Sequence, residues 1–156
     1  TITGECCPQQ KNYKHRVGTP LSKMIEAVGG VPEAAAKAIS GGPMMGKAIA
    51  NLDAPTLKGS SSVLFLTEEQ TKRKEESNCI RCGKCIEACP MGLEPYLLNK
   101  LAKAGRMDDL EENKIYDCIE CGCCLFTCPA YVPLLDTIRL AKANVMKIMR
   151  SRPPKK

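Results

Sequence analysis

The chain has 156 residues, enough for one or two small domains, and eleven of them are cysteines while only 4% are aromatic, so we expect metal as well as apolar packing to stabilise part of the fold. No apolar stretch is long enough to span a membrane and nothing resembles a signal peptide, which argues against a transmembrane protein and a secreted disulfide framework. The formal net charge of +6 is concentrated toward the C-terminal end, and we expect no nucleic-acid partner.

The pattern of residues 1–68 predicts a small α+β module with a β-grasp-like fold. Alternating side chains indicate strands at residues 1–3 and 13–17, and the apolar run 63–66 is typical of a core strand. Residues 34–39 are ambiguous, because alanine favours a helix whereas a position before a glycine pair suits a buried strand. The chain starts without methionine or leader, and we interpret it as cut from a larger protein on the N-terminal side of this module.

One helix is expected within this module. Thr19 suits the N-cap and Pro20 the first helical position, while Gly29-Gly30 supplies the end. Its apolar stripe consists of Leu21, Met24, Ile25 and Val28.

A glycine-rich segment follows at residues 41–48. It is one residue short of a phosphate-binding G-x4-G-K-[ST] loop, because Ala48 replaces the hydroxyl that would bind Mg²⁺. No acidic partner for the metal is evident. We therefore expect a tight loop in which Pro43-Met44-Met45 packs against an apolar surface.

The stretch 69–77 is rich in charge and predicts a connector, and residues 78–150 predict a helical domain. Helical spacing indicates one helix from Leu93 to Leu101 with a stop at Gly105. We expect Asp108 to cap a second helix, which holds Leu110, Ile115 and Tyr116.

Pro133 then opens a longer helix that Pro153-Pro154 ends. Its apolar face consists of Leu134, Leu135, Ile138, Ala141, Val145 and Ile148. A basic tail at 151–156 closes the chain. With the preceding helix it carries cations that could attract an acidic partner or an anionic membrane surface, or form a solvated face. These cations are Lys142, Lys147, Arg150, Arg152, Lys155 and Lys156.

Two cysteine runs carry the chemistry of the helical domain. Residues 79–90 and 118–129 both fit C-x2-C-x2-C-x3-C-P, the ferredoxin run that binds cubane iron–sulfur clusters. The fourth cysteine of such a run binds the other cluster in two-cluster ferredoxins. The first [4Fe–4S] cluster is therefore assigned to Cys79, Cys82, Cys85 and Cys128. The second is assigned to Cys118, Cys121, Cys124 and Cys89.

Other uses of these cysteines are less well supported. Zinc takes four ligands and would leave half of each run unexplained. Cys123 lies beside Cys124, but only Cys124 preserves the spacing. Cys6 and Cys7 are far from both runs and are expected to be reduced structural cysteines.

The exchanged fourth ligands would bring the two clusters close together, as in an electron-transfer wire. We expect apolar side chains near the runs to exclude water from the sulfurs: Ile80, Ile86, Ile119, Leu125 and Phe126. N–H groups near Gly83 and Gly122, and the cations Arg81 and Lys84, would raise the reduction potentials. No catalytic constellation is evident, since His15 is the only histidine. The chain by itself is expected to be an electron carrier.

Taken together, these residues resemble the C subunit of the Rnf electron-transport complex, an ion-translocating ferredoxin–NAD⁺ oxidoreductase. The similarity covers nearly the whole chain, and the glycine–methionine loop beside the doubled cluster motif makes it specific. The matching segments are Val17–Leu21, Ser40–Gly46, Asn78–Cys85, Ala88–Leu93, Asp117–Cys124, Pro133-Leu134 and Ile138–Lys142.

The resemblance implies a soluble-ligand-binding β-grasp (SLBB) module followed by a helical domain with two [4Fe–4S] clusters. It implies FMN and NAD(H) on an upstream domain of the same polypeptide, against which the module packs. The clusters would relay electrons between that flavin/NAD(H) domain and the membrane-bound subunits, with ferredoxin as a further partner. Such a protein lies peripherally on the cytoplasmic face of a bacterial or archaeal plasma membrane.

Two other electron-transfer proteins fit the same motifs. A cobalamin reductase of bacterial microcompartments shares the general layout. An iron–sulfur subunit of another membrane dehydrogenase, or of a disulfide reductase, would share the cluster domain but needs no β-grasp-like module.

Overall fold

The computed structural model describes residues 1–153 and divides the chain into two compact units. The first is Thr1–Arg73 and the second begins at Lys74. The boundary lies within the stretch 69–77, where the charged sequence predicts a connector. Lys155 and Lys156 of the expected basic tail lie outside the described residues.

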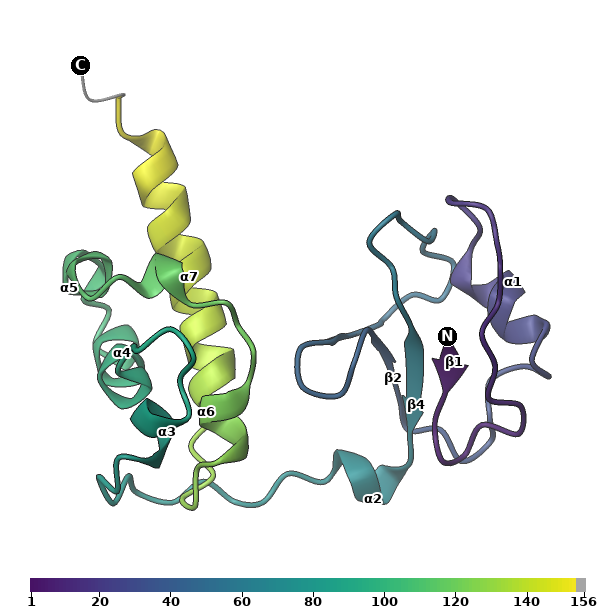
Figure 1. Ribbon diagram of the computed structural model, residues 1–156, viewed down its shortest axis with the longest axis horizontal. Helices are drawn as coiled ribbons and strands as arrows, with labels where there is room; N and C mark the ends of the chain where they lie inside the picture. Colours follow the sequence, from purple (N-terminus) through teal and green to yellow (C-terminus); the bar gives the residue numbers. More distant parts are fainter. Residues whose placement is uncertain (154–156) are drawn as a thin grey trace. The chain divides into compact units, whose positions relative to one another are not determined.

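The first unit is a four-stranded sheet with one helix beside it (Figure 1). Its strands are β1 (Ile2–Thr3), β2 (Lys37–Ser40), β3 (Lys47–Ala48) and β4 (Val63–Leu66). The order across the sheet is β1-β4-β2-β3; β1 runs parallel to β4, and β2 runs antiparallel to both of its neighbours. The ambiguous stretch before the glycine pair thus supplies a central strand, because β2 finds partners on both edges.

Helix α1 (Leu21–Glu26) covers the sheet with the predicted stripe. Its side chains Leu21, Met24 and Ile25 are buried with Val28 in one core that also contains Phe65 and Val63. Phe65 is fully buried because alternate side chains of β4 point inward. A short helix, α2 (Glu68–Thr71), ends the unit and is held to it by a 2.7 Å hydrogen bond from Gln70 to Glu5.

Two expectations for this unit are wrong. Residues 13–17 form a loop, because this stretch pairs with no strand: the nearest bridge joins Lys11 to Ile2. Thr19 does not cap α1, since its hydroxyl donates to the carbonyl of Arg16 at 2.7 Å. Pro20 is instead the N-cap, held in extended geometry by its bridge to Pro55.

The glycine-rich segment 41–46 is the turn between β2 and β3. A phosphate loop leads into a helix N-terminus, whereas Lys47 belongs to a strand. The expected packing of the methionines is not found, since Met44 and Met45 are 41% and 54% exposed. The segment is therefore a tight hairpin turn that presents two methionines at the surface.

Gly46→Ala should destabilise the first unit by about 1–3 kcal/mol, the usual cost of overpacking. An added Cβ would lie 2.4 Å from the Ile39 side chain and 2.5 Å from the carbonyl oxygen of Gly42. Gly42→Ala is the matched control, because its Cβ meets nothing within 4 Å. Urea unfolding of both variants measures the difference; an equal loss of stability would contradict this account of the turn.

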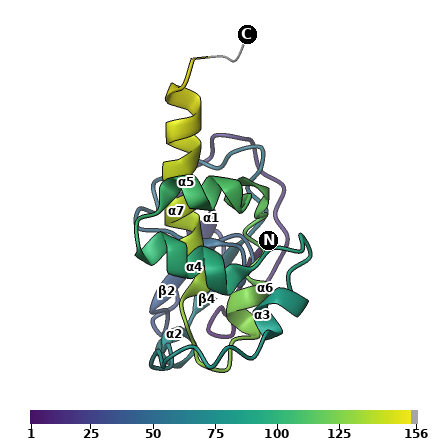
Figure 2. The same ribbon diagram turned by 90° about the vertical axis from the view of Figure 1, so that its left-hand side faces the viewer.

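The second unit is helical (Figures 1 and 2). Its helices are α3 (Lys84–Glu87), α4 (Pro95–Lys103), α5 (Met107–Glu112), the 3₁₀ turn η1 (Ile115–Asp117), α6 (Cys123–Phe126) and α7 (Leu134–Ser151). Figure 2 shows α4 and α5 lying across the long α7, with the short α3 and α6 near its N-terminal end. Among residues 1–153, no helix is long and apolar enough to cross a membrane.

The core of this unit lies where α4, α5 and η1 meet α7. Leu98, Leu110, Ile115, Ile138 and Val145 are each at most 1% exposed. The predicted face of α7 is thus confirmed, except that Ile148 is 39% exposed near the end of the helix. Four of the cysteines pack against this core, namely Cys85, Cys89, Cys118 and Cys128.

The two cysteine runs form the same local structure, which therefore occurs twice in this unit. In each, a loop leads into a one-turn helix (α3 or α6), a turn after the Cys-Pro pair follows, and a longer helix (α4 or α7) comes next. The turn contains Gly92 in the first copy and Tyr131 in the second, both with positive φ. The short helices pack on each other, as do the long ones. The sequence repeat is therefore also a structural repeat.

Three expectations for this unit need correction. The N-cap of α5 is Arg106, so Asp108 lies inside the first turn, where a carboxylate still favours the helix dipole. Ile115 and Tyr116 belong to η1, because Lys114 adopts a left-handed φ of 55° that ends the α-helical path.

The expected apolar cover over the sulfurs is the third, and it holds only in part. Ile80, Ile119 and Phe126 are 68%, 51% and 80% exposed, and Ile86 is 36% exposed. Only Leu125 is partly buried. Ile80 and Ile86 nevertheless line the same cavity as the cysteines of the first run, and Ile119 lines that of the second. Leu125 and Phe126 line neither cavity, so three of the five side chains lie beside the cysteines as expected.

Candidate metal centre

Each cysteine run begins with a loop bent by two left-handed residues. In the first loop Arg81 and Gly83 have φ of 55° and 81°. In the second, Glu120 and Gly122 have φ of 57° and 84° at the corresponding positions. Left-handed backbone costs a non-glycine residue about 1–2 kcal/mol, and such strain concentrates at functional sites. The bends turn successive cysteines toward one side.

The first run lines a cavity of about 760 Å³. Four cysteine side chains share this cavity: Cys79, Cys82 and Cys85 from the first run and Cys128 from the second. Cys79 and Cys82 are exposed, while Cys85 and Cys128 are partly buried. Polar side chains on α4 also line the cavity, namely Asn99, Lys100 and Lys103.

The second run lines a separate, smaller cavity of about 20 Å³. Its four cysteines are Cys118, Cys121 and Cys124 of the second run and Cys89 of the first. The remaining lining is mainly apolar and includes Leu98, Leu135 and Ile138. The fold therefore brings together the same two sets of cysteines that the exchanged assignment groups, because each fourth cysteine follows a helix that packs on the other copy.

The three remaining cysteines lie outside both cavity linings. Cys123 forms a side-chain hydrogen bond with Cys121, and this bond raises the pKa of Cys123. Cys7 is buried in the core of the first unit, and Cys6 packs against that core. All eleven cysteines are free thiols in this structure, so the described residues contain no disulfide.

Burial is the main influence on the thiols of the two sets. It raises the pKa of Cys124 to about 12, with the neighbouring Cys118 adding to the shift. Burial also raises the pKa of Cys118, against the opposing effects of the Glu120 backbone N–H and the Lys142 charge. The pKa of Cys85 is raised by burial and further by Cys128. Crowded thiols of this kind lose their protons most readily to a bound metal, which stabilises the thiolates.

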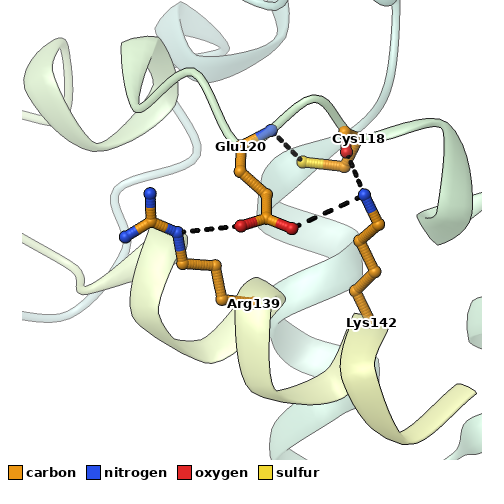
Figure 3. Close-up of polar contacts among 4 residues, drawn as sticks. All are labelled: Cys118, Glu120, Arg139 and Lys142. Atoms are coloured by element: carbon orange, nitrogen blue, oxygen red, sulfur yellow. Dashed lines mark hydrogen bonds and ion pairs between the residues drawn. The ribbon is translucent and has the colours of Figure 1, made fainter. Parts of the chain in front are cut away.

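A polar network fixes the second loop to α7 (Figure 3). The backbone N–H of Glu120 donates to Cys118 Sγ at 3.4 Å, and Lys142 Nζ donates to the Cys118 carbonyl oxygen at 2.6 Å. The Glu120 carboxylate lies 3.1 Å from Arg139 Nε and 3.5 Å from Lys142 Nζ. All three side chains are 30% exposed or less, so these ion pairs are only partly screened by water. The network holds a ligand-bearing loop in place.

The donor chemistry of both cavities fits an iron–sulfur cluster. Each offers four thiols, which matches the Cys₄ ligation of a cubane. Neither lining contains a histidine, and the carboxylate of Glu120 beside the second cavity is engaged by Arg139 and Lys142. Within residues 1–153, no three or more of the usual ligand side chains are grouped to hold a single metal ion. A cubane needs wider spacing than a single ion, because each thiolate binds a different iron atom.

Two features of the site are not evident from the sequence. The pairing of Glu120 with Arg139 and Lys142 joins residues about 20 positions apart, although the three-residue spacing of the two cations on one helix is a weak signal. Asn99 is 8% exposed, and its Oδ1 lacks a hydrogen-bond partner among the described residues. A single asparagine in an apolar helix face gives no hint that it lines a cavity.

Comparison with known proteins agrees with this site. Residues 71–130 match the family model of the 4Fe-4S dicluster domain, and residues 1–48 match that of the SLBB domain. The match to the dicluster model covers both cysteine runs.

Three curated relatives are each named as the C subunit of an ion-translocating oxidoreductase complex. The chain is 46% identical over 114 residues to the C subunit of the proton-translocating ferredoxin:NAD(+) oxidoreductase complex of Clostridium ljungdahlii, covering 73% of this chain and 24% of that protein. It is 42% identical over 146 residues to the Na(+)-translocating counterpart of Acetobacterium woodii, covering 94% and 33%. It is 39% identical over 145 residues to the C subunit of the ion-translocating oxidoreductase complex of Rhodobacter capsulatus, covering 93% and 28%. The chain thus spans about a quarter to a third of the length of these relatives.

Proposed function

The chain belongs to the family of C subunits of ion-translocating ferredoxin–NAD⁺ oxidoreductase complexes, and on that premise we propose that it relays electrons through two [4Fe–4S] clusters. The observation that carries the proposal is the grouping of eight cysteines into two cavities of four, each completed by a cysteine from the other run. A bound cubane supplies one-electron chemistry.

The ligands proposed for the first cluster are Cys79, Cys82, Cys85 and Cys128. Those proposed for the second are Cys118, Cys121, Cys124 and Cys89. The role of the chain's own residues is to hold the thiolates, to restrict water and to fix the distance between the two sites. Packing of α3 on α6 and of α4 on α7 makes that distance a property of the fold.

The names of the relatives support a place for this relay within an ion-translocating complex. We propose that electrons pass between a flavin and NAD(H) domain in the rest of the polypeptide, which carries FMN, and the membrane-bound subunits. Ferredoxin is the external electron carrier named for the related complexes. The β-grasp-like module, predicted at residues 1–68 and matching the SLBB model over residues 1–48, is proposed to pack against the flavin domain. Peripheral association on the cytoplasmic face of the membrane fits this arrangement.

The function is tested in membranes that contain the whole complex. Cys89→Ser should abolish ferredoxin-dependent reduction of NAD⁺ while sparing NADH oxidation by ferricyanide, which accepts electrons directly from a flavin. Cys123→Ser is the matched control, since Cys123 lies outside both cavity linings. Unchanged NAD⁺ reduction in Cys89→Ser would refute a relay through the second cluster.

Glu120→Ala should loosen the second cluster selectively. Loss of this carboxylate removes the two ion pairs that join the loop to Arg139 and Lys142. Residues that orient metal ligands typically contribute about 10–100-fold in metal affinity. The measurement is the rate at which a chelator removes iron from the reduced protein, followed by EPR. Glu112→Ala, at an exposed carboxylate on α5, should have no effect; equal losses in both variants would show that the network does not protect the cluster.

A further inference from the structure

The structural repeat allows the two cluster sites to be compared position by position. Most corresponding residues have the same character. Lys100 and Lys103 on α4 correspond to Arg139 and Lys142 on α7, so each site has two cations at the same helix positions. Among the corresponding residues that line the two cavities, a loop residue differs in the sign of its charge and a helix residue changes from an amide to an apolar side chain.

The loop position reverses its charge between the copies. Arg81 lines the first cavity together with the two α4 lysines, and no Asp or Glu lines that cavity. The corresponding Glu120 lines the second cavity and engages both α7 cations in ion pairs. The lining of the first site is therefore the more positive, even though Lys103 pairs with Glu76 outside the cavity at 2.8 Å. Positive charge stabilises the reduced, more negative state of a cluster.

The helix position changes from polar to apolar. Asn99 lines the first cavity, whereas Ile138 lines the second. Both are buried, at 8% and 1% exposure. An amide carries two N–H donors that can reach a sulfur atom, and isoleucine has none. No described residue bonds to Asn99 Oδ1, so that end of the amide imposes no competing orientation. Hydrogen bonds to cluster sulfurs raise the reduction potential.

The cysteines of the two sites also differ in solvent exposure, and this difference again favours a higher reduction potential at the first site. Cys79 and Cys82 of the first site are exposed, while Cys124 of the second is buried among apolar side chains. Water stabilises added negative charge, and an apolar lining does not. Charge, hydrogen bonding and exposure thus all favour reduction at the first site.

We propose that the cluster held by Cys79, Cys82, Cys85 and Cys128 has the higher reduction potential and takes the first electron, and that Asn99 and Arg81 set this order. This inference rests on the proposed two-cluster function. A one-electron donor transfers one electron to one cluster, and the net charge of that cluster becomes more negative by one. No bond is made or broken. Asn99 and Arg81 act on the potential without binding iron. The first site is therefore where an electron in the relay resides at equilibrium.

The test is an EPR-monitored redox titration of the anaerobically purified chain with dithionite. Cys89→Ser identifies the signal of the second cluster, since it removes a ligand of that cluster only. In the unmodified chain, the signal that survives Cys89→Ser should titrate at the higher potential. Asn99→Leu, which replaces the amide by a group of similar size, should lower that potential by about 59 mV, a tenfold change in the equilibrium constant of a one-electron couple.

Arg81→Glu provides a second variant that does not disturb the core, because Arg81 is exposed. It should lower the same potential and leave the other nearly unchanged. Asn144→Leu and Lys147→Glu are the controls, at exposed positions of α7 beyond the network, and should shift neither potential. If the first cluster of the unmodified chain had the lower reduction potential, or if neither Asn99→Leu nor Arg81→Glu shifted its potential, this inference would be overturned while the proposed function stood. A chain without two clusters would overturn the proposed function as well.

Discussion

Replacing Cys89 by serine is expected to damage the cluster whose other ligands lie in the second cysteine run, although Cys89 belongs to the first. Cys89 lines the same cavity as Cys118, Cys121 and Cys124. The protein should then lose up to half of its iron, on the order of four atoms, with the cluster of Cys79, Cys82 and Cys85 retained. Iron and sulfide analysis with EPR measures both changes.

The reciprocal variant makes this result decisive. Cys128→Ser should damage the first cluster and spare the second, because Cys128 lines the first cavity. Cys123→Ser should retain both clusters. If Cys89→Ser instead removed the cluster of its own run, each run would bind one cluster by itself, and the exchanged ligand assignment would be wrong.

Removal of iron should unfold the second unit and leave the first unit folded. The second unit begins at Lys74, and four of its cysteines pack directly against its core. In small zinc domains a structural metal contributes roughly 10–16 kcal/mol to folding, whereas a whole domain has only about 5–15 kcal/mol of net stability. The first unit has a separate core around Phe65 and α1 and contains no proposed ligand.

Hydrogen exchange followed by mass spectrometry measures both units in one sample. After oxidative loss of the clusters, amides of α4 and α7 should exchange rapidly, while those of β2 and β4 should keep their protection. The first unit is thus the internal control. Persistent protection of α7 without iron would show that apolar packing alone folds the second unit, against the role assigned to the clusters.

Local sequence signals predict those parts of the fold that local forces determine. The stripe of α1 and the face of α7 follow from helical spacing, and both are buried as expected apart from Ile148. Residues 34–39 are ambiguous in sequence because the choice depends on tertiary pairing, and β2 forms there because β4 and β3 offer partners on both edges. Residues 13–17 alternate like a strand but find no partner. Pattern alone does not supply a neighbouring strand.

The cysteine spacing predicts which thiols share a site, since the two cavities gather the same sets. It does not predict the polar surroundings. Glu120 and Arg81 occupy equivalent loop positions, yet only the folded repeat reveals that they are equivalent and opposite in charge. Asn99 is similarly inconspicuous until its counterpart, Ile138, is known. These differences between two copies depend on long-range packing, which a single motif does not encode.

The most direct test of the central claim is the iron and acid-labile sulfide content of the anaerobically purified chain, with an EPR spectrum after reduction by dithionite. Two [4Fe–4S] clusters predict about eight iron atoms, an equal amount of sulfide and a spectrum with magnetic coupling between two reduced centres. Zinc without sulfide would contradict the electron-transfer function. About four iron atoms would contradict the second cluster and the exchanged ligands on which the relay depends.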